Sequence, residues 1–429
     1  MRKISLIILA TIALTFSSCR KTPDYVPYIG GNSSLAYSTY AEQFDVLWNN
    51  INTGYVFWDV DTTDWDAVYE EYMPKFEELD MRKLPWSVTT EELQVMYEEI
   101  MGGLVDHHML VKIKNLYPVS MNLMNPSYVV SINPANNEIK KRDYYYKESH
   151  KIADELSKFN KNLASNLVSG YKVAYSGYEK VNTAEVQVTV CYILFELPDG
   201  RYIPYLWQNG YKMSVIMSGL NNATSPYYKA AQLIDKWTNA ALKTSKNKLA
   251  GVILDNRCNN GGYLSDLNYV VSPFIKKDLE VISTRYKEGP GRLEHSVWSP
   301  VTIKASTENR DLAGENIPYV VLSNIYSISM GEITTYAISQ LPTGYVVGER
   351  TYGATGPLLS DAVDMTYGGP FGDIERERHY VYTSTYEIKT HEGFVPEGIG
   401  FSPDKEVLTR DAGVQGQLDA ALEYIKNYK

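Results

Sequence analysis

Residues 319–356 read YVVLSNIYSISMGEITTYAISQLPTGYVVGERTYGATG, and this stretch decides how the chain folds. It begins with a β-branched apolar run, 319–322, which predicts a buried strand. Apolar residues follow at helical spacing over 333–341, and Pro342 ends that helix. A second apolar run, 345–347, predicts another strand. The order strand, helix, strand predicts a parallel β-α-β unit and an α/β (α+β) fold class.

Ser329 stands directly before the predicted helix of this unit. A serine in that position lies among backbone N–H groups that have no intrahelical acceptor, at the positive end of the helix dipole. Such donors stabilise a developing oxyanion, which acyl transfer requires. The alternative is an N-cap serine with no chemical role. The rest of the chain has to distinguish the two.

Composition limits the classes of function. A length of 429 residues predicts two or three domains. With 44% hydrophobic and 21% charged residues, the chain has the composition of an ordinary globular protein. A net charge of −10 argues against a nucleic-acid partner, because phosphate binding needs basic surface.

The first residues predict export. Basic residues at 2–3 precede a short apolar run over 4–16, as in a signal peptide. The ending Ser17-Ser18-Cys19 resembles a bacterial lipoprotein box. This resemblance implies that Cys19 becomes the first residue of the mature protein and carries a lipid. The alternative is ordinary signal-peptide cleavage, with Cys19 present by chance. Arg20 resembles an outer-membrane sorting signal. We therefore expect a signal peptide over 1–19, a tether over 20–34, and a lipid-anchored protein of the bacterial envelope, located at the outer membrane.

The next segments divide into a helical domain, 35–103, and a strand with a variable insertion, 104–180. The insertion contains a predicted helix over 148–167. Alternating hydrophobicity from residue 109 predicts a strand, which places His107 and His108 on opposite faces. Adjacent histidines do not have the spacing of a two-ligand metal site, and we predict neither metal nor cofactor.

A second strand–loop–helix unit lies in the predicted core domain, 181–429. The apolar run 249–254 predicts a buried strand, and a helix is expected from Ser265 onward. The loop between them contains Gly261 and Gly262. Adjacent glycines let a backbone approach another group closely and direct N–H groups toward it, although glycine pairs are also common in ordinary loops.

Five motifs in order resemble those of the C-terminal processing (tail-specific) serine peptidases. They are Asp106-His107-His108, the run LDNRCNNGG at 254–262, SISMGE at 327–332, VGERTYG at 347–353 and PEGIGFSPD at 396–404. The resemblance implies a ClpP/crotonase-like protease core after a small N-terminal helical domain. It also implies a peptide or protein substrate, hydrolysed through an acyl-enzyme.

The resemblance further implies site residues. The family's catalytic lysine would follow the glycine of VGERTYG, where this chain has Ala354, so it resembles the tricorn-like branch that uses a histidine base. Ser329 would be the nucleophile, His108 its base, and Glu397 would orient that base. Backbone N–H groups of Met330 and of Gly261 or Gly262 would form the oxyanion hole. Activity would rise near pH 6–7, where histidine titrates.

Three alternatives stay open. Tricorn has a serine where this chain has His107, so either histidine could be the base. A family member with a decayed site would be a lipid-anchored protein that binds peptides or glycans. An α/β-hydrolase esterase would pair Ser329 with downstream residues such as Asp364 and His379 or His391, but Ser327 replaces the first glycine of its nucleophile elbow.

Overall fold

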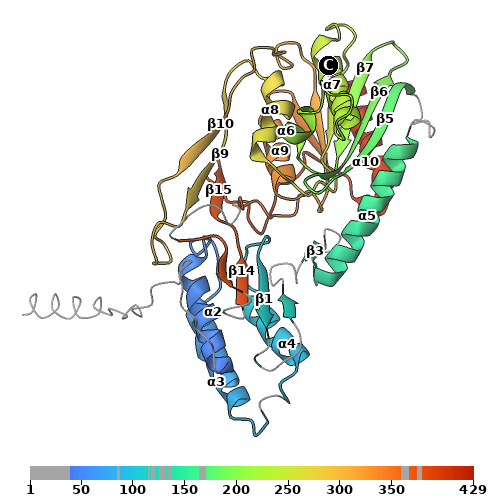
Figure 1. The fold of residues 1–429 in the computed structure, drawn as a ribbon. Coiled ribbons are helices and arrows are strands. Elements are labelled where there is room, and N and C mark those ends of the chain that lie inside the picture. The colour runs from blue at the N-terminus through green and yellow to red at the C-terminus, as the bar shows by residue number, and fades with distance from the viewer. Residues whose placement is uncertain are drawn as a thin grey trace, which may run out of the picture.

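The computed structural model describes residues 39–84, 87–114, 116, 121–124, 131–133, 138–140, 142–163, 171–358, 367–373 and 379–429. They form two lobes, one built on the N-terminal helices and one on a large sheet with its covering helices (Figure 1). The predicted signal peptide and tether lie outside the described residues. Among those residues, no helix combines the length and the hydrophobicity that crossing a membrane requires.

The N-terminal lobe contains the predicted helices. They are α2 (Tyr40–Gly54), α3 (Trp65–Asp80) and α4 (Thr90–Met101). Each begins at an N-cap whose side chain accepts a backbone N–H, namely Thr39, Asp64 and Thr89. Aromatic side chains fill the space between α2 and α3, where Trp48 and Trp65 stack with their ring centroids 6.2 Å apart.

A four-stranded antiparallel sheet joins distant parts of the chain in this lobe. Its order is β13 (Phe371–Asp373), β14 (His379–Tyr382), β1 (Leu110–Lys114) and β2 (Met121–Met124). Val381 pairs with Val111, and both are buried in the N-terminal core. β13 and β14 were predicted in the core domain, but Phe371 and Val381 pack in this lobe instead. The connection into β1 carries His107 and His108.

The segment predicted as an insertion also contributes to the core sheet. It contains β3 (Ser131–Asn133), β4 (Glu138–Lys140), α5 (Arg142–Asn162) and β5 (Lys172–Asn182). The helix predicted over 148–167 therefore begins and ends earlier. β5 is the edge strand of the large sheet, so that sheet begins before residue 181. Most of β5 is exposed or half-buried, which is why it lacks the apolar run by which a buried strand is recognised.

The large sheet has seven strands and contains both predicted β-α-β segments. The order is β16 (Lys405–Glu406), β12 (Gly344–Gly348), β11 (Tyr319–Ser323), β8 (Val252–Asp255), β7 (Tyr202–Gln208), β6 (Gln187–Glu196) and β5. β7, β8, β11, β12 and β16 pair in parallel, while β5, β6 and β7 pair antiparallel. Every residue of β8 and β11 is buried, as their continuous apolar runs predict.

Helices cover both faces of this sheet (Figure 1). One core contains α6 (Met213–Met217), α7 (Tyr228–Lys243) and α9 (Met330–Ser339), and the other contains α5 and α10 (Thr409–Asn427). The helix expected from Ser265 is instead three short turns: η3 (Leu264–Asp266), α8 (Leu267–Val270) and η4 (Ser272–Phe274). A third sheet lies beside the core in the order β10 (Ser299–Ile303), β9 (Leu279–Tyr286) and β15 (Tyr386–Thr390).

Candidate active site

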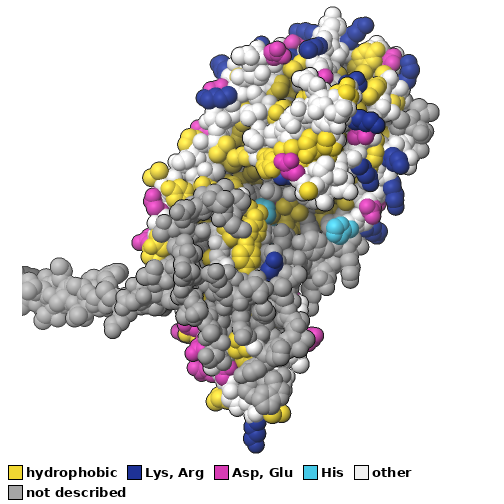
Figure 2. All heavy atoms as spheres, in the orientation of Figure 1, with side chains coloured by type: hydrophobic (Ala, Val, Ile, Leu, Met, Phe, Trp, Pro, Cys, Tyr) yellow, Lys and Arg dark blue, Asp and Glu magenta, His cyan; other side chains and the backbone are white. Residues whose placement is uncertain are grey.

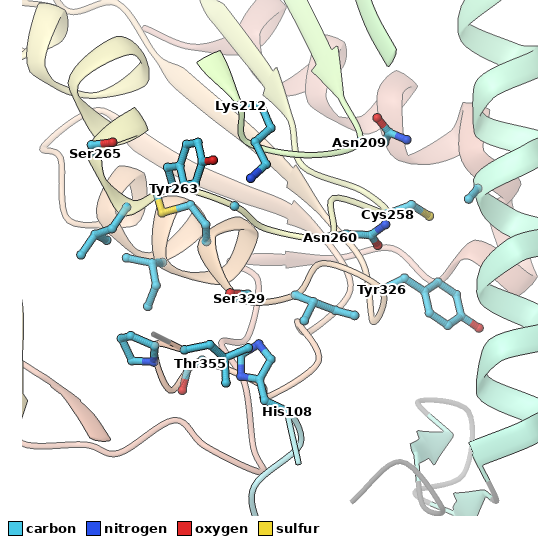
Figure 3. A pocket seen from close by; sticks show the side chains of 18 of the residues that line it. His108, Asn209, Lys212, Cys258, Asn260, Tyr263, Ser265, Tyr326, Ser329 and Thr355 are labelled. Atoms are coloured by element: carbon cyan, nitrogen blue, oxygen red, sulfur yellow. The ribbon is translucent and has the colours of Figure 1, made fainter. Parts of the chain in front are cut away.

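Ser329 is the residue before α9, and its backbone has an unusual conformation. Its φ is 57° and its ψ is −122°. A positive φ is uncommon for a residue with a side chain and costs of the order of 1–3 kcal/mol, so the surrounding structure must hold it. Ser329 is half-buried and lines a pocket of about 1340 Å³. Figure 3 shows it within that pocket.

Hydrogen bonds on both sides fix the loop that carries Ser329. The Ser329 N–H donates to the Ala354 carbonyl (2.9 Å). Upstream, the Ser327 hydroxyl donates to the Asn256 carbonyl (2.8 Å), and the Asn324 N–H donates to Ser327 Oγ (3.0 Å). The nucleophile loop is therefore tied to the loop after β8 and to the loop after β12, which is how segments remote in sequence meet.

The buried carboxylate of Glu332 links the Ser329 loop to the loop after β12, a role that was not predicted from the sequence. It is fully buried. Its Oε1 accepts from the Thr351 hydroxyl (2.7 Å) and the Gly353 N–H (2.7 Å), and its Oε2 accepts from the N–H groups of Ala354 (2.8 Å) and Ser329 (3.2 Å). Burial raises the pKa of Glu332 to about 7. The sequence did contain a signal for this role, because Glu332 follows Ser329 by three positions and that spacing is typical of a capping box.

The glycine pair is positioned directly against Ser329. A Cβ added to Gly261, whose φ is +81°, would lie 2.6 Å from Ser329 Cβ. A Cβ on Gly262, whose φ is +145°, would lie 1.9 Å from the Tyr211 carbonyl oxygen. Only glycine satisfies both the backbone angles and the close approach.

Two of the three predicted oxyanion donors are free. The Gly261 N–H donates to Asn259 Oδ1 (2.9 Å) and is therefore occupied. The Met330 N–H is the first of α9 and has no intrahelical acceptor. Gly262 is exposed and lines the pocket, and within the described part of the chain neither its N–H nor that of Met330 has an acceptor. This pair could hold an oxyanion.

The strand predicted from residue 109 is β1, which begins at Leu110. The two histidines lie in the turn before it, so the alternation of a strand does not set their directions. They nevertheless point to different places. His108 lines the pocket, and Figure 3 shows its ring reaching toward Ser329. The His107 ring packs against Tyr352, with the ring centroids 4.9 Å apart. The geometry therefore favours His108 as the base.

Burial controls the protonation of His108. It lowers the pKa of His108 to about 4, opposed by a hydrogen bond to the Gly356 backbone. His108 Nδ1 is buried and has no hydrogen-bond partner among the described residues. At neutral pH the imidazole is therefore uncharged and able to accept a proton. The backbone N–H of His108 donates to Asp106 Oδ1 (2.8 Å), which fixes the turn.

Glu397 reaches this site through the backbone, and it makes no hydrogen bond to the His108 ring among the described residues. Its Oε1 accepts from the His107 N–H (3.0 Å), and its Oε2 accepts from the N–H groups of Thr355 (2.7 Å) and Gly356 (2.8 Å). Because Gly356 in turn accepts from His108, Glu397 can orient the base through that loop. A ring nitrogen of His108 and oxygens of Asp106 and Glu397 lie within 4.8 Å of one another.

The esterase alternative receives no geometric support. His379 hydrogen-bonds Asn50 in the N-terminal lobe (3.1 Å), and His391 is exposed. Neither of them lines the pocket with Ser329. Asp364 lies outside the described residues. Ala354 is fully buried, with its N–H on Glu332 and its carbonyl on the Ser329 N–H, so this position has no room for a catalytic lysine side chain.

Comparison with known proteins supports the resemblance on which these predictions were based. Residues 227–407 match the model of peptidase family S41, and residues 37–87 match that of the tricorn protease C1 domain. A putative peptidase from Parabacteroides merdae ATCC 43184 has a TM-score of 0.55 at 18% identity, over 91% of this chain and 97% of that one. Mature CPAF complexed with lactacystin has a TM-score of 0.53 at 12% identity, over 92% and 100%. No curated protein sequence matches significantly.

These findings confirm two predictions. The two family matches bear out the predicted resemblance to the C-terminal processing peptidases and to tricorn, and they support peptidase activity. The predicted fold class is also confirmed, since the chain has a central mixed sheet with covering helices after an N-terminal helical region.

Replacing Glu332 by Gln should reduce kcat by roughly 10- to 100-fold with little change in KM. An amide NH2 cannot accept the N–H groups that the carboxylate accepts, so Ser329 loses its position but the pocket keeps its shape. Steady-state kinetics with a peptide substrate would measure this. Glu423→Gln, the same change on the exposed face of α10, is the matched control. Equal activity of both variants would contradict the positioning role.

The acid limb of kcat/KM should have an apparent pKa near 4, below the range of pH 6–7 expected from sequence alone. His108 must be neutral to accept a proton, and its pKa of about 4 keeps it neutral down to about pH 5. A pH–rate profile of the wild type and of Glu332→Gln would test this. A limb near pH 7 that vanishes in the variant belongs to Glu332, whereas one that persists would contradict the assignment to His108.

Proposed function

We propose that the protein is a serine endopeptidase that hydrolyses peptide bonds through an acyl-enzyme. The observation that carries the proposal is one pocket lined by Ser329, His108 and Gly262, beside the free N–H of Met330. This combination supplies a nucleophile, a base and oxyanion donors, which are the parts that acyl transfer needs.

In the proposed reaction, His108 takes the proton of the Ser329 hydroxyl while the oxygen attacks the substrate carbonyl carbon. The carbonyl oxygen becomes an oxyanion and accepts from the N–H groups of Met330 and Gly262. Collapse of this intermediate breaks the peptide C–N bond, and His108 returns the proton to the leaving amine. Water then attacks the ester by the same steps and regenerates Ser329.

A fluorophosphonate probe should label the wild-type protein at Ser329 and should not label Ser329→Ala. His108→Ala should lower the labelling rate by roughly 100- to 10,000-fold, because the serine loses its base. His391→Ala, at an exposed histidine outside the pocket, is the control and should label normally. In-gel fluorescence with mass spectrometry of the labelled peptide gives both readouts.

Absence of label on a folded wild-type protein would instead favour the alternative of a family member with a decayed active site. The protein would then bind peptides or glycans in this pocket without cleaving them. A folded state is checked by thermal unfolding before the probe is added. Labelling that survives in His108→Ala but fails in His107→Ala would assign the base to the other histidine.

We also propose that Cys19 carries the lipid that anchors the protein to the bacterial envelope, at the outer membrane. The support is the sequence pattern alone: two basic residues, a short apolar run and Ser17-Ser18-Cys19, followed by Arg20. Metabolic labelling with a radioactive fatty acid should mark the wild type and leave Cys19→Ser unlabelled. Label that persists in Cys19→Ser would contradict the proposal.

A further inference from the structure

The pocket that contains Ser329 holds a lysine without an acidic partner. Lys212 forms no ion pair within the described residues, and its Nζ lies 3.7 Å from the centroid of the Tyr263 ring. Asp266 is near enough for Lys212 to lower its pKa, although burial raises that pKa overall. The two oxygens of Asp266 instead accept from the N–H groups of Met213 (2.6 Å) and Ser214 (3.2 Å).

Backbone contacts place Lys212 next to the proposed oxyanion loop. Tyr211, its neighbour in the chain, donates its N–H to the Gly261 carbonyl (2.6 Å) and accepts from the Tyr263 N–H (3.1 Å). Gly261 is the residue that lies directly against Ser329. Ser329 is therefore connected to Lys212 through Gly261, which contacts Ser329, and through Tyr211, which binds Gly261 and precedes Lys212 in the chain.

Figure 3 shows how these side chains face the pocket. In this view Ser329 lies between His108 and Lys212, and the Lys212 side chain extends from its backbone into the pocket beside Tyr263. Tyr263 is 40% exposed, so a bound molecule can reach both its ring and the ammonium group that it faces. A ring face stabilises a cation without neutralising it.

The charge of the pocket contrasts with the charge of the protein. The chain has a net charge of −10, yet among the described residues that line the pocket the charged ones are two lysines, Lys180 and Lys212, and one aspartate, Asp154. Lys180 and Asp154 are exposed, on β5 and α5, whereas Lys212 is half-buried beside the glycine loop. A half-buried ammonium group that forms no ion pair with any described residue attracts an anion, most strongly where water is partly excluded. In a peptide, that anion is a carboxylate.

We propose that Lys212 and Tyr263 form a subsite that binds a carboxylate of the peptide substrate close to the bond that is cleaved. The carboxylate is supplied either by an aspartate or glutamate side chain or by the C-terminus of the substrate. Both present a carboxylate to the ammonium group of Lys212, so the structure indicates a carboxylate ligand, and the experiment distinguishes a side chain from a C-terminus. This inference rests on the proposed peptidase function.

The test uses synthetic peptide mixtures whose cleavage products are identified by mass spectrometry. Each mixture is made with Glu or Gln at every varied position, and with either a free C-terminal acid or a C-terminal amide. The wild type should prefer peptides with a carboxylate at a fixed number of residues from the cleaved bond. In Lys212→Met this preference, measured as a ratio of kcat/KM values, should fall by about tenfold or more.

Two variants control the result. Lys212→Arg keeps a positive charge in the same place and should keep most of the preference. Lys180→Met removes the other lysine that lines the pocket, and it should keep the wild-type ratio if the effect is specific to Lys212. Thermal unfolding of each variant shows whether it is folded.

The outcomes distinguish the sources and the possible failures. Loss of the preference on changing Glu to Gln identifies a side-chain carboxylate, and loss on amidation identifies the chain terminus. A wild type that cleaves without any carboxylate preference, or an unchanged preference in Lys212→Met, overturns the subsite while leaving the peptidase intact. If nothing is cleaved, binding of the same peptides to Ser329→Ala decides the subsite separately: binding that ignores both the carboxylate and Lys212 overturns it.

Discussion

The site depends on one constraint, the positive φ of Ser329. With a φ of 57°, this residue exposes its side chain at the start of α9 and leaves the Met330 N–H free beside it. A serine does not hold this conformation by itself, because the left-handed region costs of the order of 1–3 kcal/mol. Two features offset that cost. Glu332 ties the Ser329 N–H to the loop over 351–354, and Gly261 provides the empty space against Ser329 Cβ.

The loop that supplies this glycine is itself anchored by a buried ion pair. Arg257 Nη2 and Asp255 Oδ2 are 2.6 Å apart, with both side chains fully buried. Arg257 also donates to the Val414 carbonyl and to Gln417 on α10, and Tyr205 donates to Asp255 (2.6 Å). Removing one partner of such a pair typically costs about 3–5 kcal/mol, because a charge then stays buried alone. The aspartate and arginine of the motif at 254–262 therefore act on the loop and not on the substrate.

Sequence could predict the parts of this fold that rest on continuous apolar runs. The strands β8 and β11 and the helix α9 were found because buried parallel strands have a clear pattern. The edge strand β5 was missed because its side chains are mostly exposed. The pairing of β14 with β1 joins residues more than 250 positions apart in the chain, and no local pattern records it. The serine and both glycines were identified from motifs. The hydrogen bonds of Glu332 around Ser329, and the contact of Glu397 with His108 through the backbone, depend on contacts between loops that the sequence does not show.

Figure 2 shows the Lys, Arg, Asp and Glu side chains of the core lobe spread over its outer surface, whereas His108 is buried beside Asp106 and Glu397. This setting explains how a neutral His108 could still act as a base. All four groups that Glu397 contacts are donors, from His107, Thr355 and Gly356, and donors favour its ionised form although burial raises its pKa well above the ordinary value. The Glu397 carboxylate and the His108 ring lie within 4.8 Å of each other, and at about that separation a carboxylate attracts an imidazolium by about 3 kcal/mol at an effective dielectric constant near 20. In the proposed reaction that attraction exists only once His108 has taken the proton, so it would stabilise the transition state and not the resting protein. Burial thus keeps the proposed base neutral beforehand, and in the proposed reaction the buried carboxylate of Glu397 would stabilise the positive charge that His108 gains.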